Sequence, residues 1–340
     1  VTSNSGRYMH VMKVLPSISF EVCSCLVQVF DLYYYAVCAY FGSDHVSHGV
    51  QLCTTRLSDA LKRIESTSLV ADTQATTEGT NVVDHQLIGA RMCSSVSRDL
   101  PSNLYALAER VVAVESLLFV AAQLDSLQVT LEQLVSPAKR PFVQQYYVQT
   151  VATTSDVRAL VYGCVATRAI DYSHLLTAVH STTWDINELM SQHNWYIDHL
   201  VTDLSTFNQR LQSIRVDAQP IPLETYEIVW DTVIHCCNRV LVEGYSQSGR
   251  RCTNEGRALM QLDFQQLIRK LEALTTLRPI PHRDIVENYV KAYYLPESAI
   301  EQWIMQHRSV YTVKQLCTLL TVCTHISKKT RDQLTKKLTA

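Results

Sequence analysis

Glycine and serine residues in the stretch 244–251 come closest to a pattern that could do chemistry. The stretch reads Gly-Tyr-Ser-Gln-Ser-Gly-Arg-Arg, and its two glycines have the spacing of a phosphate-binding loop. That motif needs a lysine and a hydroxyl after the second glycine and a strand before the first, whereas arginines follow here and a helix is predicted before it. A nucleophile elbow around Ser246 fails in the same way, because Ser248 stands where that motif has glycine. We therefore predict a polar turn, and a hydrolase centred on Ser246 is the minor alternative.

Histidine and cysteine residues form a few short groups that could bind a metal. His45 and His48 lie in a predicted loop, and the His-Cys-Cys run at 235–237 lies on a predicted helix, where adjacent side chains diverge. No pair of Cys-x-x-Cys motifs is present to form a zinc knuckle. Asp231 lies one helical turn before the run, a spacing that structural pairs also have. We predict no metal and no cofactor.

Basic residues near the C-terminus could contact a membrane or an acidic partner. Ile326, Leu334 and Leu338 can form an apolar stripe opposite to them. A basic amphipathic helix can bind anionic lipid, but a solvated outer face is the simpler interpretation. The residues concerned are Lys328, Lys329, Arg331, Lys336 and Lys337.

Composition favours a helical protein without a nucleic-acid surface. The 340 residues carry 30 Lys and Arg against 32 Asp and Glu, so no basic footprint for nucleic acid is expected. Glycine occurs only 9 times, which argues against turn-rich sandwiches and doubly wound sheets. Abundant Val and Thr favour strands instead, so periodicity must decide. Charged residues make up only 18%, which suggests extra apolar surface for partners.

Cysteine usage and the missing glycosylation sequons indicate a cytosolic protein. Eleven cysteines are scattered along the chain, and no Asn-x-Ser/Thr sequence occurs. No signal peptide is visible, and no window is expected to be long and apolar enough to span a bilayer. The best apolar run, 111–122, carries Glu115.

Apolar periodicity predicts helices along most of the chain. The clearest helix covers 102–135, where apolar residues step by three and four from Leu104 to Leu134 with one skip. Thr312 and Gln315 have the spacing of a capping box. Further helices are predicted at 8–41 (a buried pair split at Pro16), 54–64, 142–178 (one or two), 184–214 (two), 223–243, 254–277, 284–295, 296–308, 313–322 and 328–338.

A polar stretch and a proline-rich joint suggest the domain organisation. Residues 66–102 are rich in Ser, Thr, Ala, Asp and Gly and show weak periodicity, which predicts a long mobile surface loop. Pro220 and Pro222 separate two broad helical units, predicted at 1–218 and 219–340. The fold class predicted from the residues is all-α, with no active site of its own.

Several long strings resemble the syndetin C-terminal domain family. The string Cys252–Gln266 (CTNEGRALMQLDFQQ) matches the signature stretch of that family, and Arg278–Pro281 and Lys291–Leu295 follow in the same order. Earlier strings at 104–116 and 190–194 resemble the family too. The resemblance spans nearly the whole chain and is weakest at 66–102 and at the tail.

The resemblance implies a non-enzymatic subunit of a vesicle-tethering complex. Family members are subunits of the endosome-associated recycling protein (EARP) complex, which tethers vesicles in endocytic recycling and works with SNARE proteins. The implied architecture is an elongated stack of helical bundles, as in CATCHR-type tether subunits. The implied location is the cytosol, with peripheral association at recycling endosomes and trans-Golgi membranes. No catalytic residues are carried over, and neither nucleic acid nor a small-molecule substrate is expected.

Within this interpretation, one helix offers a candidate contact face for partner subunits. Its polar residues lie beside the apolar stripe of the predicted helix at 254–277, although capping and pairing within the bundle would explain them equally well. The candidates are Asn254, Glu255, Arg257, Asp263 and Gln265.

Overall fold

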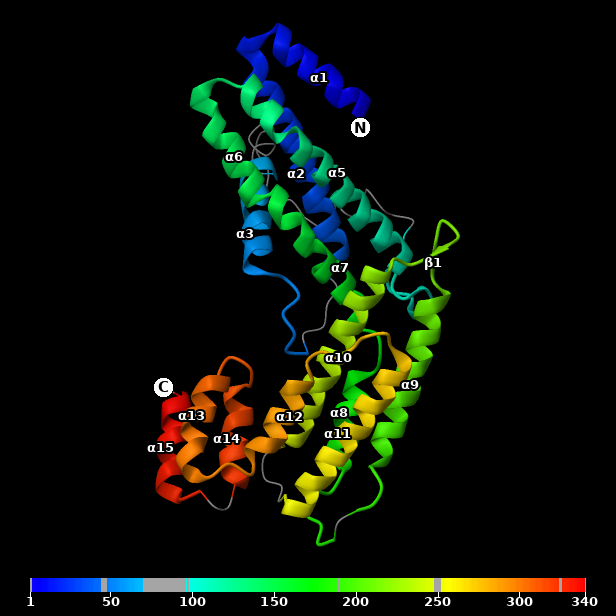
Figure 1. Ribbon diagram of the computed structural model, residues 1–340, viewed down its shortest axis with the longest axis vertical. Coiled ribbons are helices and arrows are strands. Elements are labelled where there is room, and N and C mark those ends of the chain that lie inside the picture. Colours follow the sequence, from blue (N-terminus) through cyan, green and yellow to red (C-terminus); the bar gives the residue numbers. More distant parts are fainter. Residues whose placement is uncertain are drawn as a thin grey trace, which may run out of the picture. The chain divides into compact units, whose positions relative to one another are not determined.

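A computed structural model shows that the chain is helical almost throughout the described residues (Figure 1). Contacts divide the chain into two compact units, which are residues 1–46, 51–165 and 213–228, and residues 47–50, 166–212 and 229–340. The all-α prediction is confirmed. The structure describes residues 2–43, 48–69, 96, 98–188, 190–247, 252–323 and 326–339.

The first unit is built from α-helices joined by short 3-10 turns. Pro16 splits the first predicted helix pair as expected, because proline cannot continue the hydrogen-bond ladder of the preceding helix. Thr54 caps the helix that follows, its side chain accepting a hydrogen bond from the backbone N–H of Leu57 at 3.2 Å. The helices are α1 (Thr2–Val14), α2 (Ser19–Phe41), α3 (Thr55–Ile64), α5 (Leu107–Leu134), α6 (Arg140–Gln149) and α7 (Val157–Ala166).

The core of the first unit lies between α2, α5 and their neighbours. The stripe predicted on α5 is buried in part. Leu118 and the three leucines at 124, 127 and 134 are half-buried, and the fully buried members are Leu107, Val111, Val114, Ala121 and Leu131. Arg110 is fully buried beside this stripe and donates hydrogen bonds to the backbone carbonyls of Tyr105 (2.8 Å) and Phe41. The long helix predicted at 102–135 begins at Leu107, a few residues after a 3-10 turn at Pro101–Asn103.

Helix α2 corrects the expectation that no segment could span a bilayer. The continuous helical stretch Pro16–Phe41 has a mean hydropathy of 1.5 and is long and apolar enough to cross a membrane by length and composition. In this fold it packs into the first unit through Phe30, Tyr34 and Cys38. Asp31, also buried on α2, accepts a hydrogen bond from the hydroxyl of Tyr146 on α6 at 3.1 Å.

A short antiparallel hairpin joins the helical segments near residue 217. Its strands are β1 (Arg215–Val216) and β2 (Gln219–Pro220), and Arg215 pairs with Pro220. Asp217 and Ala218 form the turn with positive φ angles of 48° and 66°. This is the only strand pairing in the described part of the chain.

The second unit contains the remaining helices. Thr312 and Gln315 form the predicted capping box at the start of α14. The helices are α8 (Tyr172–Ser181), α9 (Trp195–Ser213), α10 (Leu223–Tyr245, from residue 229 on), α11 (Asn254–Leu274), α12 (Arg283–Ala292), α13 (Glu297–His307), α14 (Val313–Val322) and α15 (Lys328–Thr339).

Two sequence-based expectations about elements were wrong. Residues 184–214 hold one helix, α9, rather than two. The described residues before α9 are tied to the start of α11 instead, since Thr253 donates through its hydroxyl to the carbonyl of Ile186 at 2.7 Å and through its N–H to the carbonyl of Trp184 at 3.1 Å. The stretch 142–178 holds α6, α7 and most of α8, one helix more than expected.

The contact-based units also differ from the predicted division at 218 and 219. Residues 166–212 group with the C-terminal helices, because α9 packs through Phe207 against Trp230 of α10, with ring centroids 5.5 Å apart. The predicted mobile loop at 66–102 lies largely outside the described residues, and its two ends form short helical turns at Glu65–Leu69 and Pro101–Asn103.

Candidate functional site

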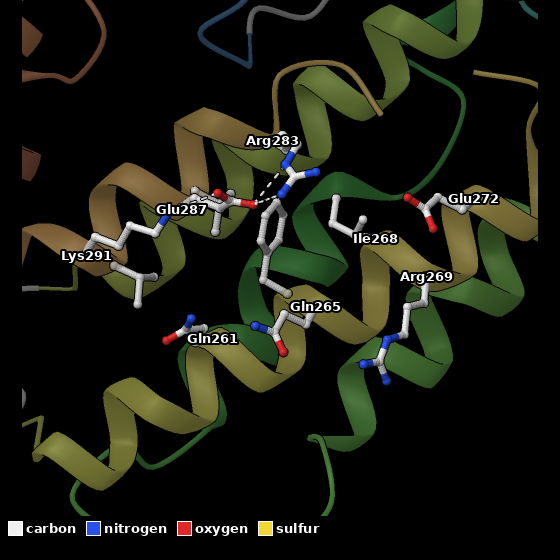
Figure 2. Close-up of a pocket in the computed structure, with 11 residues that line it drawn as sticks. Gln261, Gln265, Ile268, Arg269, Glu272, Arg283, Glu287 and Lys291 are labelled. Atoms are coloured by element: carbon white, nitrogen blue, oxygen red, sulfur yellow. Dashed lines mark hydrogen bonds and ion pairs between the residues drawn. The ribbon is translucent and has the colours of Figure 1, made fainter. Parts of the chain in front are cut away.

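A groove lies between α11 and α12 on the surface of the second unit (Figure 2). It has a volume of about 390 Å³. Figure 2 shows Gln261 and Gln265 of α11 on one wall and Glu287 and Lys291 of α12 on the other. The helices place these residues because Gln261 and Gln265, like Glu287 and Lys291, are four residues apart and therefore share a helix face. The floor is apolar and consists of Phe264, Ile268, Val286 and Val290.

Ion pairs organise the α12 wall of the groove. Glu287 accepts from Arg283 Nε at 2.9 Å and from Lys291 Nζ at 3.1 Å, so one carboxylate lies between two cations at a spacing of one helical turn. Partial burial acts to raise the pKa of Glu287, but the hydrogen bonds from Lys291 and Arg283 outweigh it and hold this pKa below its usual range. Glu287 therefore stays ionised at neutral pH and keeps both long side chains on the wall.

The lining of the groove offers both polar and apolar contacts to a partner. Its walls offer amide and charged groups for hydrogen bonds, and Ile268 supplies half-buried apolar surface between them. A shallow channel with an apolar floor and polar rims fits a peptide segment.

Asp263, predicted on a contact face, lies inside the second unit. Its side chain is 0% exposed and accepts from the N–H and the side-chain amide of Asn194, both at 2.8 Å, and from the hydroxyl of Tyr196 at 2.7 Å. Tyr245 continues this cluster, with its hydroxyl 3.0 Å from that of Tyr196. Burial raises the pKa of Asp263, although its hydrogen bonds act in the opposite direction. The residue thus joins α11 to the start of α9 and to α10.

Arg257 is likewise an interior residue. Only 5% of it is exposed, and its guanidinium lies 4.7 Å from the ring centroid of Tyr293 in a cation–π contact. It also donates to the side-chain oxygen of Asn254 at 3.2 Å and to the carbonyl of Cys252 at 3.5 Å. The surface role predicted for Arg257 and Asp263 is therefore corrected, because long-range partners that no local pattern reveals bury both side chains.

The other predicted contact residues are more accessible. Asn254 and Gln265 are exposed and Glu255 is half-buried. Gln265 is the only one of the five that lines the groove, and contact of these three with a partner stays a prediction. The α12 residues were missed, although the four-residue spacing of Arg283, Glu287 and Lys291 was a readable signal of a charged helix face.

Ser246 has the geometry of a helix-end residue. It is 1% exposed, follows α10 directly, and donates through its hydroxyl to the carbonyl of Glu243 at 2.9 Å. A helix precedes it, as expected, so the strand that a nucleophile elbow requires is missing at this point. Residues 248–251 of the stretch lie outside the described residues. This arrangement gives no support to a hydrolase centred on Ser246.

The histidines considered as metal ligands have other contacts. His235 stacks on His282, with centroids 4.1 Å apart, and Asp231 bonds to His282 Nε2 at 3.1 Å rather than to its helix neighbour. Burial, followed by the charges of His282 and Arg239, lowers the pKa of His235 to about 4. His45 lies outside the described residues. No group of three or more His, Cys, Asp or Glu side chains that could hold a metal occurs in the described ranges.

The basic C-terminal helix uses its apolar side within the fold. Leu334 and Leu338 on α15 are buried, so the stripe predicted opposite the charges is not free to enter a bilayer. Arg331 donates to the carbonyls of Cys323 (3.2 Å) and Ile326 (3.4 Å), which is a structural role. The side chains of Lys328, Lys329, Lys336 and Lys337 remain exposed, and Lys337 pairs with Glu301 at 2.5 Å. Their contact with membrane or an acidic partner stays a prediction.

These features define a helical protein with a peptide-sized groove and polar clusters buried for packing. Comparison with known proteins gives the family. The family model described as "Syndetin, C-terminal" matches residues 104–339. Syndetin of Gallus gallus is 43% identical over 337 residues, and syndetin of Mus musculus is 43% identical over 338 residues. The chain belongs to the syndetin family.

The match covers the two proteins unequally. It takes in 97% of this chain but 35% of the chicken and mouse proteins. The chain thus spans about a third of the length of the curated relatives that it matches.

Proposed function

We propose that this chain is a non-enzymatic, protein-binding part of a vesicle-tethering subunit of the EARP complex. It would act in endocytic recycling by binding other tether subunits and SNARE proteins. It would lie in the cytosol, peripherally associated with recycling endosomes and trans-Golgi membranes. The observation that carries the proposal is family membership, at 43% identity over 97% of the chain.

The α11–α12 groove is the contact surface in this proposal. Its support is the combination of amide walls, an apolar floor and the charged row of α12. Its lining includes three cations, Arg269, Arg283 and Lys291, against Glu272 and Glu287, which favours an amphipathic partner helix with acidic flanks. In this proposal the groove takes the place of the contact face predicted at Arg257 and Asp263, because both side chains are buried.

Affinity capture tests both parts of the proposal. A tagged full-length protein that carries this chain is expressed in cells, and co-captured proteins are quantified by mass spectrometry. The expected result is recovery of the other tether subunits and SNARE proteins. The variant Gln265→Trp/Ile268→Arg fills the groove and should reduce recovery of at least one of them. Lys270→Glu, at an exposed α11 position outside the groove, is the matched control.

The possible outcomes separate the function from its location. Recovery of no tether subunit by the unmodified protein contradicts the proposed function. Equal recovery by the unmodified protein and the groove variant leaves tethering in place and removes the groove as its contact surface.

A further inference from the structure

Two turns meet at one end of the first unit. The 3-10 turn at Pro16–Ile18 joins α1 to α2, and the 3-10 turn at Pro137–Lys139 joins α5 to α6. Figure 1 shows both connections at the same end of these helices. Phe20 links them, since its ring centroid lies 5.3 Å from that of Phe142 in an edge-on contact. We call residues 13–18 and 136–142 the tip.

The tip exposes large apolar side chains. Every residue in both segments is exposed, including Val14 (61%), Leu15 (49%), Ile18 and Phe142. The neighbouring residues Met12 and Val143 are buried, so the helices themselves are well packed at this end. Two adjacent turns that each present apolar residues form an accessible cluster of the kind that marks an interaction site.

The tip is also cationic. Lys13, Lys139 and Arg140 lie in it, and Glu21 and Glu132 flank it, with Arg140 Nε donating to the backbone carbonyl of Glu132 at 3.0 Å. The ammonium of Lys139 lies 4.4 Å from the ring centroid of Phe20, which holds one charge directly beside the apolar cluster. Long basic side chains next to exposed apolar groups can reach lipid headgroups while the apolar groups enter the bilayer boundary.

We propose that the tip is a membrane-contacting surface that binds bilayers containing anionic lipid. Apolar groups on two chain turns can enter the headgroup region together, which an apolar face along the side of a helix packed in a bundle cannot do as readily. Three cations and no acidic residue within the tip match the negative surface of such a bilayer. The surface is distinct from α15, whose apolar residues are buried.

Vesicle flotation tests the proposal with the 340-residue chain. The probes are vesicles of phosphatidylcholine alone and vesicles that also contain phosphatidylserine. The chain should float with the anionic vesicles, far less with the neutral ones, and less as salt is raised. Leu15→Ser/Ile18→Ser should weaken binding about tenfold, because it removes apolar area that enters the bilayer. Lys13→Gln/Arg140→Gln should reduce binding to the anionic vesicles only.

Matched variants distinguish the tip from general apolar or basic surface. Val29→Ser/Val148→Ser changes two apolar residues that are at least as exposed and lie on α2 and α6 outside the tip, and it should leave binding unchanged. Lys328→Gln/Lys336→Gln removes charge from α15 and should also leave it unchanged. Circular dichroism should give the same helix signal for every variant.

Three results would overturn the proposal. The first is failure of the unmodified chain to bind anionic vesicles. The second is undiminished vesicle binding by the Leu15→Ser/Ile18→Ser variant. If the Lys328→Gln/Lys336→Gln variant then loses vesicle binding, the contact belongs to α15. The third is an unmodified chain that self-associates in analytical ultracentrifugation but binds no vesicles, together with a Leu15→Ser/Ile18→Ser variant that no longer self-associates. That result would assign the tip to a contact between protein chains.

Discussion

Replacing the buried Asp31 with asparagine should stabilise the chain at neutral pH. Asp31 lies on α2 inside the first unit, where burial raises its pKa from 3.8 to about 6, although the hydrogen bond from Tyr146 and the charge of Arg63 act to lower it. The ionised form is therefore disfavoured in the folded state. Asparagine keeps the size and an oxygen that can accept from Tyr146, and it replaces the ionisable oxygen with a neutral NH2 group.

The magnitude follows from the two pKa values. The difference between 3.8 and about 6 corresponds to up to about 3 kcal/mol of stability. The folded state binds the proton more tightly, so this contribution is fully present below about pH 4. It is lost as the pH rises towards 6 and stays lost above it. Asp31→Asn does not titrate, so relative to pH 4 its advantage should grow to about 2–3 kcal/mol at pH 7.

Urea unfolding between pH 4 and pH 8 measures this effect. The difference in the free energy of unfolding between variant and unmodified chain should rise mainly between pH 4 and pH 6 and then level off. Glu21→Gln is a control, because it removes an exposed carboxylate from the same helix. It should change stability by less than about 1 kcal/mol. A difference that does not vary with pH, or one that favours aspartate at pH 7, would refute the assigned pKa shift.

Two further substitutions test the packing of the second unit. Asp263→Ala should lower the free energy of unfolding by about 3–5 kcal/mol in urea titrations, because buried donors of Asn194 and Tyr196 lose their acceptor. Asp263→Asn keeps one acceptor oxygen and should lower it by less. Equal losses for the two variants would contradict this role of the carboxylate. Gly256→Ala should cost about 2 kcal/mol or more in thermal melts, because its Cβ would collide with a backbone carbonyl. Gly6→Ala, whose Cβ meets nothing, should not destabilise; similar melting temperatures for both variants would count against the reasoning.

Local sequence patterns predicted the helices well because helix faces repeat within a few residues. The apolar steps that predict α5 and the capping box at Thr312 depend only on neighbours in the chain; the helix and the capping box are both found. The single helix within 184–214 could not be predicted in this way. The residues before α9 are fixed by Thr253, more than sixty positions later, and no local window contains that contact.

The candidate site was predicted only in part for a related reason. Polar residues beside an apolar stripe predict an exposed face. Arg257 and Asp263 are instead buried by contacts with Tyr293 and Asn194, which come from other segments of the chain. Gln265 was correctly placed on the surface, and its groove exists because α12 packs beside α11. Which helices become neighbours is a property of the whole fold and is not written in the periodicity of either one.

The cluster at Asp263 also determines how the helices of its unit align. A slide of α11 along its axis by one turn would move each of its residues by about 5.4 Å. After such a slide, the carboxylate would lie buried away from Asn194 and Tyr196, at a cost of several kcal/mol. Asp263 thus favours the observed alignment of α11 with the start of α9. Because α11 also carries Gln261 and Gln265 of the groove, the buried carboxylate helps to hold one wall of that groove in place.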